Sequence, residues 1–452
     1  MDSLSRRDTS VPRKRVAVIG SGISGLSAAW LLSRSMDVTL YEAENRPGGH
    51  SNTVEVEGVN GPIPVDTGFI VFNDHTYPNL VALFKHLGVT THASDMSFAA
   101  SLDDGRFEYS GSGLSGLLSQ KTNALKPRFW SMVSDIIRFY KQAPLALSRA
   151  DTATLTLGDY LARERYSQAF IDDHLLPMGA AIWSTTAGDM RSYPLEAFIR
   201  FFQNHGLLLL KDRPVWRTVQ GGSREYVRRI LDDFRGTHRY GAPVVALNRD
   251  DFGVTVLCDN GHTDRFNEVV IATHANQALA MLAEPTSEEQ AVLGAFSYTP
   301  NLAVLHSDPR LMPKRKAAWA SWNYIGRKGE TGEDALCVTY WMNRLQGIVS
   351  DEPLFVTLNP AREIDPAKIH RTFQYEHPLF DPAAIEAQRQ IWKLQGQRHT
   401  WFCGAHFGSG FHEDGLQAGL AVAEQLGGIA RPWNVANPSS RIFCDALKVA
   451  AE

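Results

Sequence analysis

"RVAVIGSGISGLSAAWLLSRSMDVTLYEA" (residues 15–43) is the stretch that decides the fold. It begins with a short apolar strand and continues into a helix of small residues, with Gly20-x-Gly22-x-x-Gly25 between them. A second, alternating strand ends at Glu42, 20 positions after Gly22. A lone G-x-G-x-x-G is weak evidence. With a strand before it, a helix after it and an acid at the end of the next strand, it indicates an α/β unit that binds a dinucleotide.

The motif has a physical reading at each position. Gly20 permits a tight turn, Gly22 lets the backbone approach a pyrophosphate, and Gly25 allows close packing of helix on strand. The helix N-terminus presents free N–H groups and its positive dipole end to the phosphates. We expect contacts from Gly20, Ser21, Gly22, Ile23, Ser24, Gly25, Glu42 and Ala43, with Glu42 accepting hydrogen bonds from the ribose hydroxyls. The alternative is a glycine-rich turn in an unrelated α/β protein.

The next segments favour a flavin over a nicotinamide. "AENRPGGHSNTVEVEG" (43–58) and "VDTGFIVFN" (65–73) resemble the flavin-containing amine oxidase and phytoene desaturase superfamily. In that superfamily the ribose acid is followed by E-A-x-x-R-x-G-G-R and later by D-x-G. The matching residues are Glu42, Ala43, Arg46, Gly48, Gly49, Asp66 and Gly68. His50 stands where arginine is usual, and the resemblance implies that Phe69 and Ile70 face the flavin ring.

A second glycine-rich stretch, "FCGAHFGSGFHEDGLQAG" (402–419), holds five side chains that could bind a metal: Cys403, His406, His412, Glu413 and Asp414. Their spacing fits no zinc pattern, so we expect no metal. A strand should precede this turn, and a helix ending on Gly427-Gly428 should follow it. The resemblance implies that Gly404 approaches a phosphate and that the amides around His412 and Glu413 point at the pyrimidine end of the flavin. Asp414 stands where glycine is more usual.

The predicted fold class is α/β: a Rossmann-like FAD-binding domain of the glutathione-reductase type with an inserted α+β substrate domain. The FAD-binding domain is expected to combine residues 15–77, 210–285 and 395–440, with Val244 against the adenine by resemblance. Residues 78–209 and 286–394 should form the substrate domain, and residues 1–14 a disordered basic arm. FAD is expected to bind non-covalently, because no attachment site is evident.

Bulk properties exclude several classes of protein. Lysine and arginine total 45 against 49 acids, which gives no reason to expect nucleic-acid binding. Four cysteines without a C-x-x-C pair suit a reducing cytoplasm. The polar, basic N-terminus does not read as a signal peptide, and no run approaches the ~18 apolar residues of a membrane span. We expect a cytoplasmic protein that could contact a membrane peripherally.

The sequence indicates the substrate less directly than it indicates the cofactor. A flavin of this type takes a hydride from a carbon held over its ring. The protein therefore has to position the substrate and exclude water from the site. We consider His406, Tyr340 and Trp341 as catalytic candidates, with Trp183, Trp216, Trp322 and Phe411 as further pocket residues. For each aromatic, ordinary core packing is the alternative, and His406 could equally be a satisfied core histidine.

A closer resemblance suggests the substrate class. "GFIVFN", "WASWNY", "TYWMNRLQ" and "GFHEDGL" look like one subgroup of bacterial predicted NAD/FAD-binding proteins and the oxidase-like region of plant cyclopropane fatty acid synthases. The resemblance implies an apolar acyl chain or phospholipid, undergoing desaturation or double-bond isomerisation. Oxidation of a small amine is the second hypothesis. A third is a flavoprotein without turnover that partners a lipid-modifying methyltransferase.

One helix could bring such a protein to lipid. Residues 126–141 carry an apolar face flanked by basic residues. The face consists of Phe129, Trp130, Val133, Ile136, Ile137 and Tyr140. A buried helix of the substrate domain is the alternative. The run Leu207 to Leu210 could likewise line a tunnel or fill the core.

Overall fold

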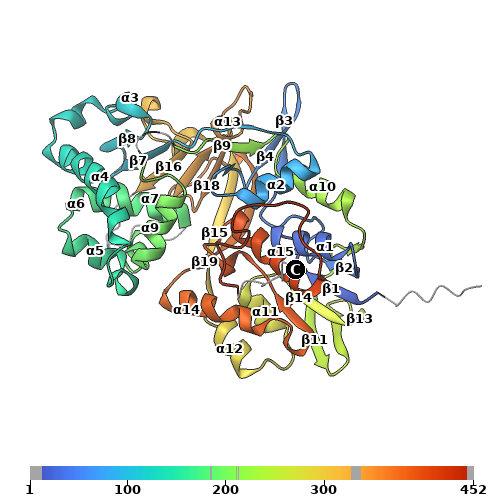
Figure 1. The fold of residues 1–452 in the computed structure, drawn as a ribbon. Coiled ribbons are helices and arrows are strands. Elements are labelled where there is room, and N and C mark those ends of the chain that lie inside the picture. The colour runs from blue at the N-terminus through green and yellow to red at the C-terminus, as the bar shows by residue number, and fades with distance from the viewer. Residues whose placement is uncertain (1–12, 184–185, 210, 212, 327–336, 445–452) are drawn as a thin grey trace, which may run out of the picture.

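The computed structural model describes residues 13–183, 186–209, 211, 213–326 and 337–444. Figure 1 shows a helical lobe carrying α3 to α9 and a second lobe carrying α1, α15 and β1. The long strands β15 and β19 run between the two lobes. Residues 1–12 of the expected basic arm lie outside the described residues.

A five-stranded parallel sheet forms the centre of the lobe that carries α1 and α15, in the order β10-β2-β1-β14-β20. Its strands are β1 (Arg15–Ile19), β2 (Asp37–Tyr41), β10 (Thr237–Arg239), β14 (Glu268–Ile271) and β20 (Thr400–Phe402). In central β1, residues 16–19 are all buried and apolar, as expected of a parallel strand covered on both faces. Strands from three distant parts of the chain therefore build one sheet.

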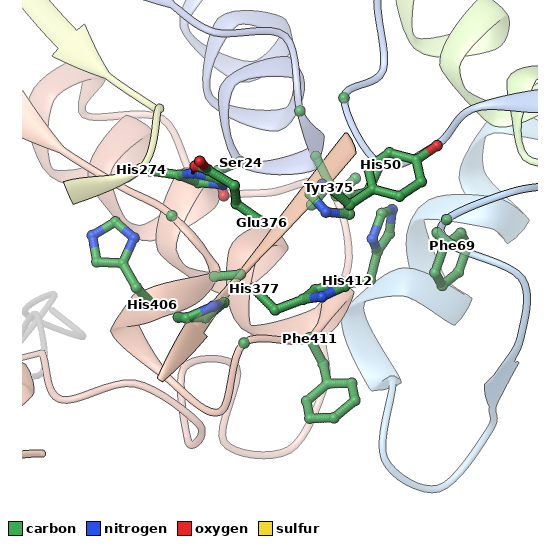
Figure 2. A pocket seen from close by; sticks show the side chains of 18 of the residues that line it. Ser24, His50, Phe69, His274, Tyr375, Glu376, His377, His406, Phe411 and His412 are labelled. Atoms are coloured by element: carbon green, nitrogen blue, oxygen red, sulfur yellow. Dashed lines mark hydrogen bonds and ion pairs between the residues drawn. The ribbon is translucent and has the colours of Figure 1, made fainter. Parts of the chain in front are cut away.

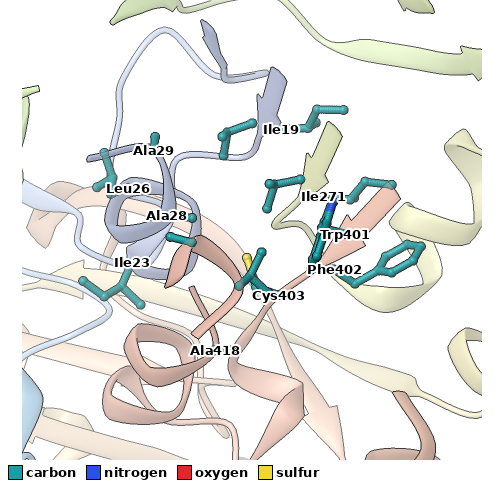
Figure 3. Packing of buried hydrophobic residues seen from close by; sticks show 14 of the residues in the cluster. Ile19, Ile23, Leu26, Ala28, Ala29, Ile271, Trp401, Phe402, Cys403 and Ala418 are labelled. Atoms are coloured by element: carbon teal, nitrogen blue, oxygen red, sulfur yellow. The ribbon is translucent and has the colours of Figure 1, made fainter. Parts of the chain in front are cut away.

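Two helices made of small residues pack together against this sheet. They are α1 (Ile23–Leu32) and α15 (His412–Gly427). A Cβ on Gly419 would lie 2.2 Å from the Ser24 carbonyl oxygen, so only glycine allows this close approach. Figure 3 shows the apolar contacts around them, including Ile23 and Ala418. The α15 helix ends as predicted, with Gly428 in the left-handed conformation at φ 64°.

A three-stranded antiparallel sheet shares this core: β11 (Val244–Asp250), β12 (Gly253–Cys258) and β13 (Thr263–Phe266). These strands lie within residues 210–285, which were expected to belong to the FAD-binding domain.

The helical lobe is built on a seven-stranded sheet of order β19-β15-β18-β17-β16-β7-β8. The strands are β7 (Phe98–Leu102), β8 (Phe107–Ser110), β15 (Ser297–His306), β16 (Trp322–Gly326), β17 (Val338–Trp341), β18 (Phe355–Leu358) and β19 (Ile369–Leu379). The β7–β8 hairpin joins the rest through the parallel pair β7–β16. Two separate inserted segments thus complete a single sheet.

Helices from the first insertion cover part of this sheet. They are α4 (Pro127–Ala146), α5 (Leu157–Arg163), α6 (Gln168–Phe170), α7 (Leu176–Trp183), α8 (Ala187–Arg191) and α9 (Leu195–Asn204). A capping box starts α5, because Thr156 and Asp159 exchange side-chain and backbone bonds there. Aromatic side chains such as Phe139 and Phe198 are fully buried between these helices and the strands.

The remaining helices and strands complete the two lobes. They are β3 (Thr53–Gly58), β4 (Gly61–Asp66), β5 (Phe72–Asn73), β6 (Thr91–Ala93), β9 (Trp216–Val219), α2 (Pro78–Leu87), α3 (Gly113–Leu117), α10 (Arg224–Asp233), α11 (Ala275–Met281), α12 (Ser287–Leu293), α13 (Met342–Leu345) and α14 (Pro382–Gln390). Buried Asp66 joins three of these segments. Its carboxylate accepts bonds from Thr53 Oγ1 (2.6 Å), Ser223 N (2.9 Å) and Gln346 Nε2 (2.9 Å).

The segment after α15 folds back over the start of that helix. Partly buried Arg441 pairs with Asp414, Nε to Oδ1 at 2.6 Å, and donates to the Thr76 carbonyl at 2.8 Å. Arg431 pairs with Glu424, Nε to Oε1 at 2.7 Å. These ion pairs fasten residues 431–441 to α15. Among the described helices, none combines the length and the apolar character needed to cross a bilayer.

Candidate active site

One continuous cavity of about 890 Å³ runs between the lobes, and Glu42 and His412 both line it. Figure 2 shows His274 and His406 on one side of this space and Phe69 and His412 on the other. The two glycine-rich stretches of the sequence therefore meet at a single site.

The first glycine turn has the geometry that its spacing predicts. Gly20 has φ +98°, and a Cβ there would lie 2.9 Å from the Ala272 carbonyl oxygen. A Cβ on Gly25 would lie 1.9 Å from the Gly20 oxygen, so helix and turn are in close contact. A Cβ on Gly22 would meet nothing within 4 Å. Gly22 therefore faces open space at the start of α1, where the first amides have no partner within the helix.

Glu42 is held at the edge of this turn by Ser21. Its Oε2 accepts bonds from the Ser21 amide (2.9 Å) and hydroxyl (2.5 Å), and its Oε1 accepts from the Glu44 amide at 2.9 Å. Each carboxylate oxygen can accept a further bond. The side chain is thus fixed in place while it still lines the cavity.

The second structural element expected to contact the cofactor is the N-terminus of α15. The His412 ring stacks on Phe69, with centroids 3.7 Å apart and planes at 9°. Its Nε2 lies 2.7 Å from the Tyr226 hydroxyl and 3.2 Å from Ser51 Oγ. The first amides of α15 have no partner inside the helix. The positive end of its dipole therefore points into the same space as Phe69, which favours negative charge there.

Two acids follow His412, and neither side chain lines the cavity. The Glu413 carboxylate accepts bonds from the amides of Asn79 and Leu80, both at 3.0 Å. Asp414 caps the Phe411 amide at 2.8 Å and pairs with Arg441. Asp414, which stands where glycine is more usual, thus anchors the helix start to the C-terminal segment.

Apart from His205, which stacks on Phe201 and Trp216, five histidines line the cavity: His50, His274, His377, His406 and His412. Burial lowers the pKa of His377 to about 4 and those of His406 and His412 to about 3. Burial lowers the pKa values of His50 and His274 as well. All five are therefore neutral near pH 7 and present hydrogen-bonding groups, not charges.

The tautomer of His377 follows from its neighbours. The Asn301 amide nitrogen donates to the Thr299 carbonyl (2.9 Å), and its oxygen accepts from Asn359 (2.8 Å). The same nitrogen lies 3.1 Å from His377 Nδ1, which must accept. Neutral His377 therefore carries its proton on Nε2.

The far half of the cavity, which we call the substrate half, is lined almost entirely by apolar and aromatic side chains. These are Met96, Phe98, Met178, Ile182, Trp183, Phe201, His205, Leu207, Trp216, Trp322, Tyr340, Leu358 and Phe380. No carboxylate is among these described residues. The carboxylates that line the cavity are Glu42, Glu44 and Glu376, and Glu376 is turned toward His274, 3.2 Å from its Nδ1.

Of the catalytic candidates, Trp341 is corrected by the structure. Tyr340 and Trp341 are neighbours on β17, so their side chains point to opposite faces of the sheet. Tyr340 lines the cavity, whereas Trp341 does not and packs edge-on against Trp319 at 5.4 Å. His406 lines the cavity on the side of His274, packed against Phe296 at 5.0 Å.

Three residues predicted to contact the cofactor do not line the cavity: Gly25, Arg46 and Glu413. Gly25 lies beneath the turn. Arg46 donates to the Gly49 carbonyl at 2.9 Å and pairs with Glu44, so it shapes the loop. The other predicted cofactor residues, from Gly20 and His50 to Val244 and Gly404, all line it.

The sequence analysis missed the contribution of β19. Tyr375, Glu376 and His377 line the cavity because this long strand leaves the substrate lobe and crosses the site. The signal was polar residues in "QYEHP", directly ahead of a proline. Among the described residues, no three His, Cys, Asp or Glu side chains are grouped as metal ligands.

Comparison with known proteins places this architecture in a family. The family model described as flavin containing amine oxidoreductase matches residues 23–367. The chain belongs to this family, and its fold and cavity are those of an FAD-dependent oxidoreductase. The glycine turn, the fixed Glu42 and the helix N-terminus at His412 fit an FAD.

Curated relatives match over short stretches. Protoporphyrinogen oxidase 2 of Arabidopsis thaliana is 49% identical over 51 residues, 11% of this chain and 10% of the relative. Amine oxidase A of Canis lupus familiaris is 42% identical over 91 residues, 20% of this chain and 16% of the relative. These matches thus span less than a fifth of each relative's length.

Solved structures match over nearly the whole chain. Putrescine oxidase bound to putrescine has a TM-score of 0.65 at 15% identity, covering 92% of this chain and 99% of that one. A fatty acid isomerase from P. acnes also scores 0.65, at 12% identity, covering 94% and 99%. Likeness at this identity establishes the fold.

Proposed function

We propose that this protein acts on an apolar substrate, a fatty-acyl chain or phospholipid, and desaturates it or moves a double bond. The observation that carries the proposal is the lining of the substrate half, which contains no carboxylate among the described residues and at least ten aliphatic or aromatic side chains. Such a lining favours burial of hydrocarbon. An ammonium ion would lack a counter-charge there.

Bound FAD would supply a ring able to accept a hydride from a substrate carbon. The chain's own residues would hold the ring in place and exclude water from the site. Phe69 and His412 form a flat stacked pair beside which the ring would lie, and the aromatic wall keeps water out. Tyr340 supplies a hydroxyl group in the substrate half. Burial alone raises the pKa of this hydroxyl, so it stays protonated at neutral pH. His406, whose pKa burial lowers to about 3, is a poor base at neutral pH.

Two comparisons support an apolar substrate. The fatty acid isomerase shares the fold. Hydroxyneurosporene desaturase of Rubrivivax gelatinosus is 48% identical over 59 residues, 13% of this chain. The putrescine oxidase fold supports amine oxidation as the second candidate. Against it, Trp322 and Tyr340 pack edge to face at 89° and so do not frame an amine between parallel rings.

The test is anaerobic mixing of purified protein with unsaturated fatty acids or phospholipids, and separately with primary amines, while flavin absorbance is followed. Acyl lipids should bleach the flavin or emerge with a moved double bond, so product analysis accompanies the spectra. Bleaching by amines alone would reject the proposal. If neither class reduces the flavin or changes chemically, the protein instead serves as a binding partner, such as one for a lipid-modifying methyltransferase.

A further inference from the structure

Exposed apolar side chains are concentrated in one short stretch of the helical lobe. Fifteen large hydrophobic residues are exposed among the described residues, and five of them fall between positions 114 and 137. They are Leu114, Leu118, Leu125, Trp130 and Ile137. A third of the exposed apolar side chains thus lies in a short stretch of the chain, which a random scatter does not explain.

The patch overlaps the face that the sequence predicted only at Trp130 and Ile137 of α4. Phe129 and Tyr140 of the predicted helical face are buried, at 1% and 9% exposure, and they fill the core. The other exposed side chains sit on α3, on the residue that follows it, and on the 3₁₀ turn Lys121–Leu125. Leu114 is 79% exposed and Leu125 85%.

Trp130 is held at the surface by a specific contact. Its indole Nε1 donates to the Ala124 carbonyl at 2.8 Å, although the side chain remains 53% exposed. The ring therefore lies beside Leu125, fixed against the turn. An indole with one apolar face outward and a bonded N–H is the arrangement that suits a water–lipid interface.

The chain around the patch is mostly basic, although Asp103 and Asp172 lie near Arg128 at the start of α4. Between residues 105 and 134 the only acid is Glu108, which is fully buried and paired with Arg315. The same stretch carries Arg106, Lys121, Lys126 and Arg128. Arg128 pairs with Asp173, while no ion pair joins Lys121 or Lys126 to a described carboxylate. An apolar surface surrounded by unneutralised lysines complements an anionic bilayer.

We infer that the surface formed by Leu114, Leu118, Lys121, Leu125, Lys126 and Trp130 docks on anionic phospholipid membranes. The three most exposed apolar side chains, Leu114, Leu125 and Trp130, enter the headgroup layer. Lys121 and Lys126 contact lipid phosphates. This inference stands on surface chemistry and is independent of the substrate that the cavity takes.

The test is co-sedimentation of the FAD-loaded protein with vesicles of phosphatidylcholine alone, or of phosphatidylcholine with 30% phosphatidylglycerol. The protein should sediment with the anionic vesicles at low salt, and raised salt should release it. Leu125→Ser/Trp130→Ser should lower the bound-to-free ratio at least tenfold, and so should Lys121→Glu/Lys126→Glu. The matched control is Phe252→Ser on the β11–β12 turn, a residue 84% exposed on the other lobe, which should sediment like wild type.

Flavin content and circular dichroism must match wild type in each variant, and the lysine pair tests the surface if the apolar pair fails to fold. Failure of wild type to bind anionic vesicles, or wild-type binding by both patch variants, would overturn the inference. So would a patch variant that turns a wild-type dimer into a monomer without any vesicle binding, because the surface would then join two copies of this chain.

Discussion

The two halves of the cavity are built by different means. The nucleotide half is made of backbone turns and of side chains that hold one another, as Ser21 holds Glu42 and Arg46 holds the Gly49 loop. The substrate half is made of large side chains from separate elements, and polar atoms such as Trp183 Nε1 and Trp322 Nε1 find no hydrogen-bond partner among the described residues. The first half is specified by local sequence, while the second is specified by packing alone.

The largest expected effect separates two glycines of one motif. Gly22→Val should give a folded protein without FAD, with affinity lowered at least 100-fold, because its Cβ would occupy open space facing the cofactor. Gly25→Val should not fold, since its Cβ would collide with the Gly20 carbonyl. Flavin absorbance and thermal unfolding of the two purified variants distinguish the outcomes. Full flavin occupancy in Gly22→Val would show that the phosphate turn is misplaced.

Next in size is the loss of the fixed carboxylate. Glu42→Gln should weaken FAD binding by about 10- to 100-fold, because a hydrogen bond to a charged group contributes roughly 1.5–3 kcal/mol. Fluorescence titration of the apoprotein with FAD measures the change. Glu44→Gln is the matched control, since Glu44 pairs with Arg46 at the cavity rim, and it should bind FAD within about threefold of wild type. Equal losses in both variants would remove the special role of Glu42.

In the substrate half, neighbouring aromatics should behave differently. Tyr340→Phe should leave FAD binding intact and lower the rate of flavin reduction by about tenfold or more if its hydroxyl moves or orients a proton. Trp341→Phe should leave both unchanged, because that ring lies outside the cavity. Rapid-mixing kinetics with an acyl substrate provide the measurement. A slow Trp341 variant beside a normal Tyr340 variant would reverse the assignment of the two faces of β17.

The smallest effect concerns pH. The folded protein holds the pKa of His377 at about 4, below the ~6.5 of an unfolded chain. The unfolded state therefore binds more protons between these values, and the free energy of unfolding should fall as pH drops below about 6.5, by up to ~1.4 kcal/mol per unit for this group. Denaturant melts from pH 7 to 5 measure the slope. His377→Gln should lower the slope by the share of this one group, and the other buried histidines should keep the rest.

The same contrast explains what the sequence could predict. The Gly20 turn, Glu42, and the helix with its end at Gly428 follow from short-range rules of turns, caps and dipoles. The crossing of β19, which brings Glu376 and His377 to the site, depends on pairing between residues far apart in the chain. The membrane-facing interpretation of residues 129–140 stays a prediction, because tertiary packing buries Phe129 and Tyr140 of that face but leaves Trp130 and Ile137 exposed.

The Arg441–Asp414 ion pair has a consequence for biosynthesis. β20, α15 and Arg441 all come from the last eighth of the chain, yet they complete the sheet and the site begun by residues 15–42. The glycine turn of residues 20–25 is therefore translated long before the helix N-terminus that completes the site. The complete site can form only after these last segments have been added, as in other large chains whose distant segments pair late.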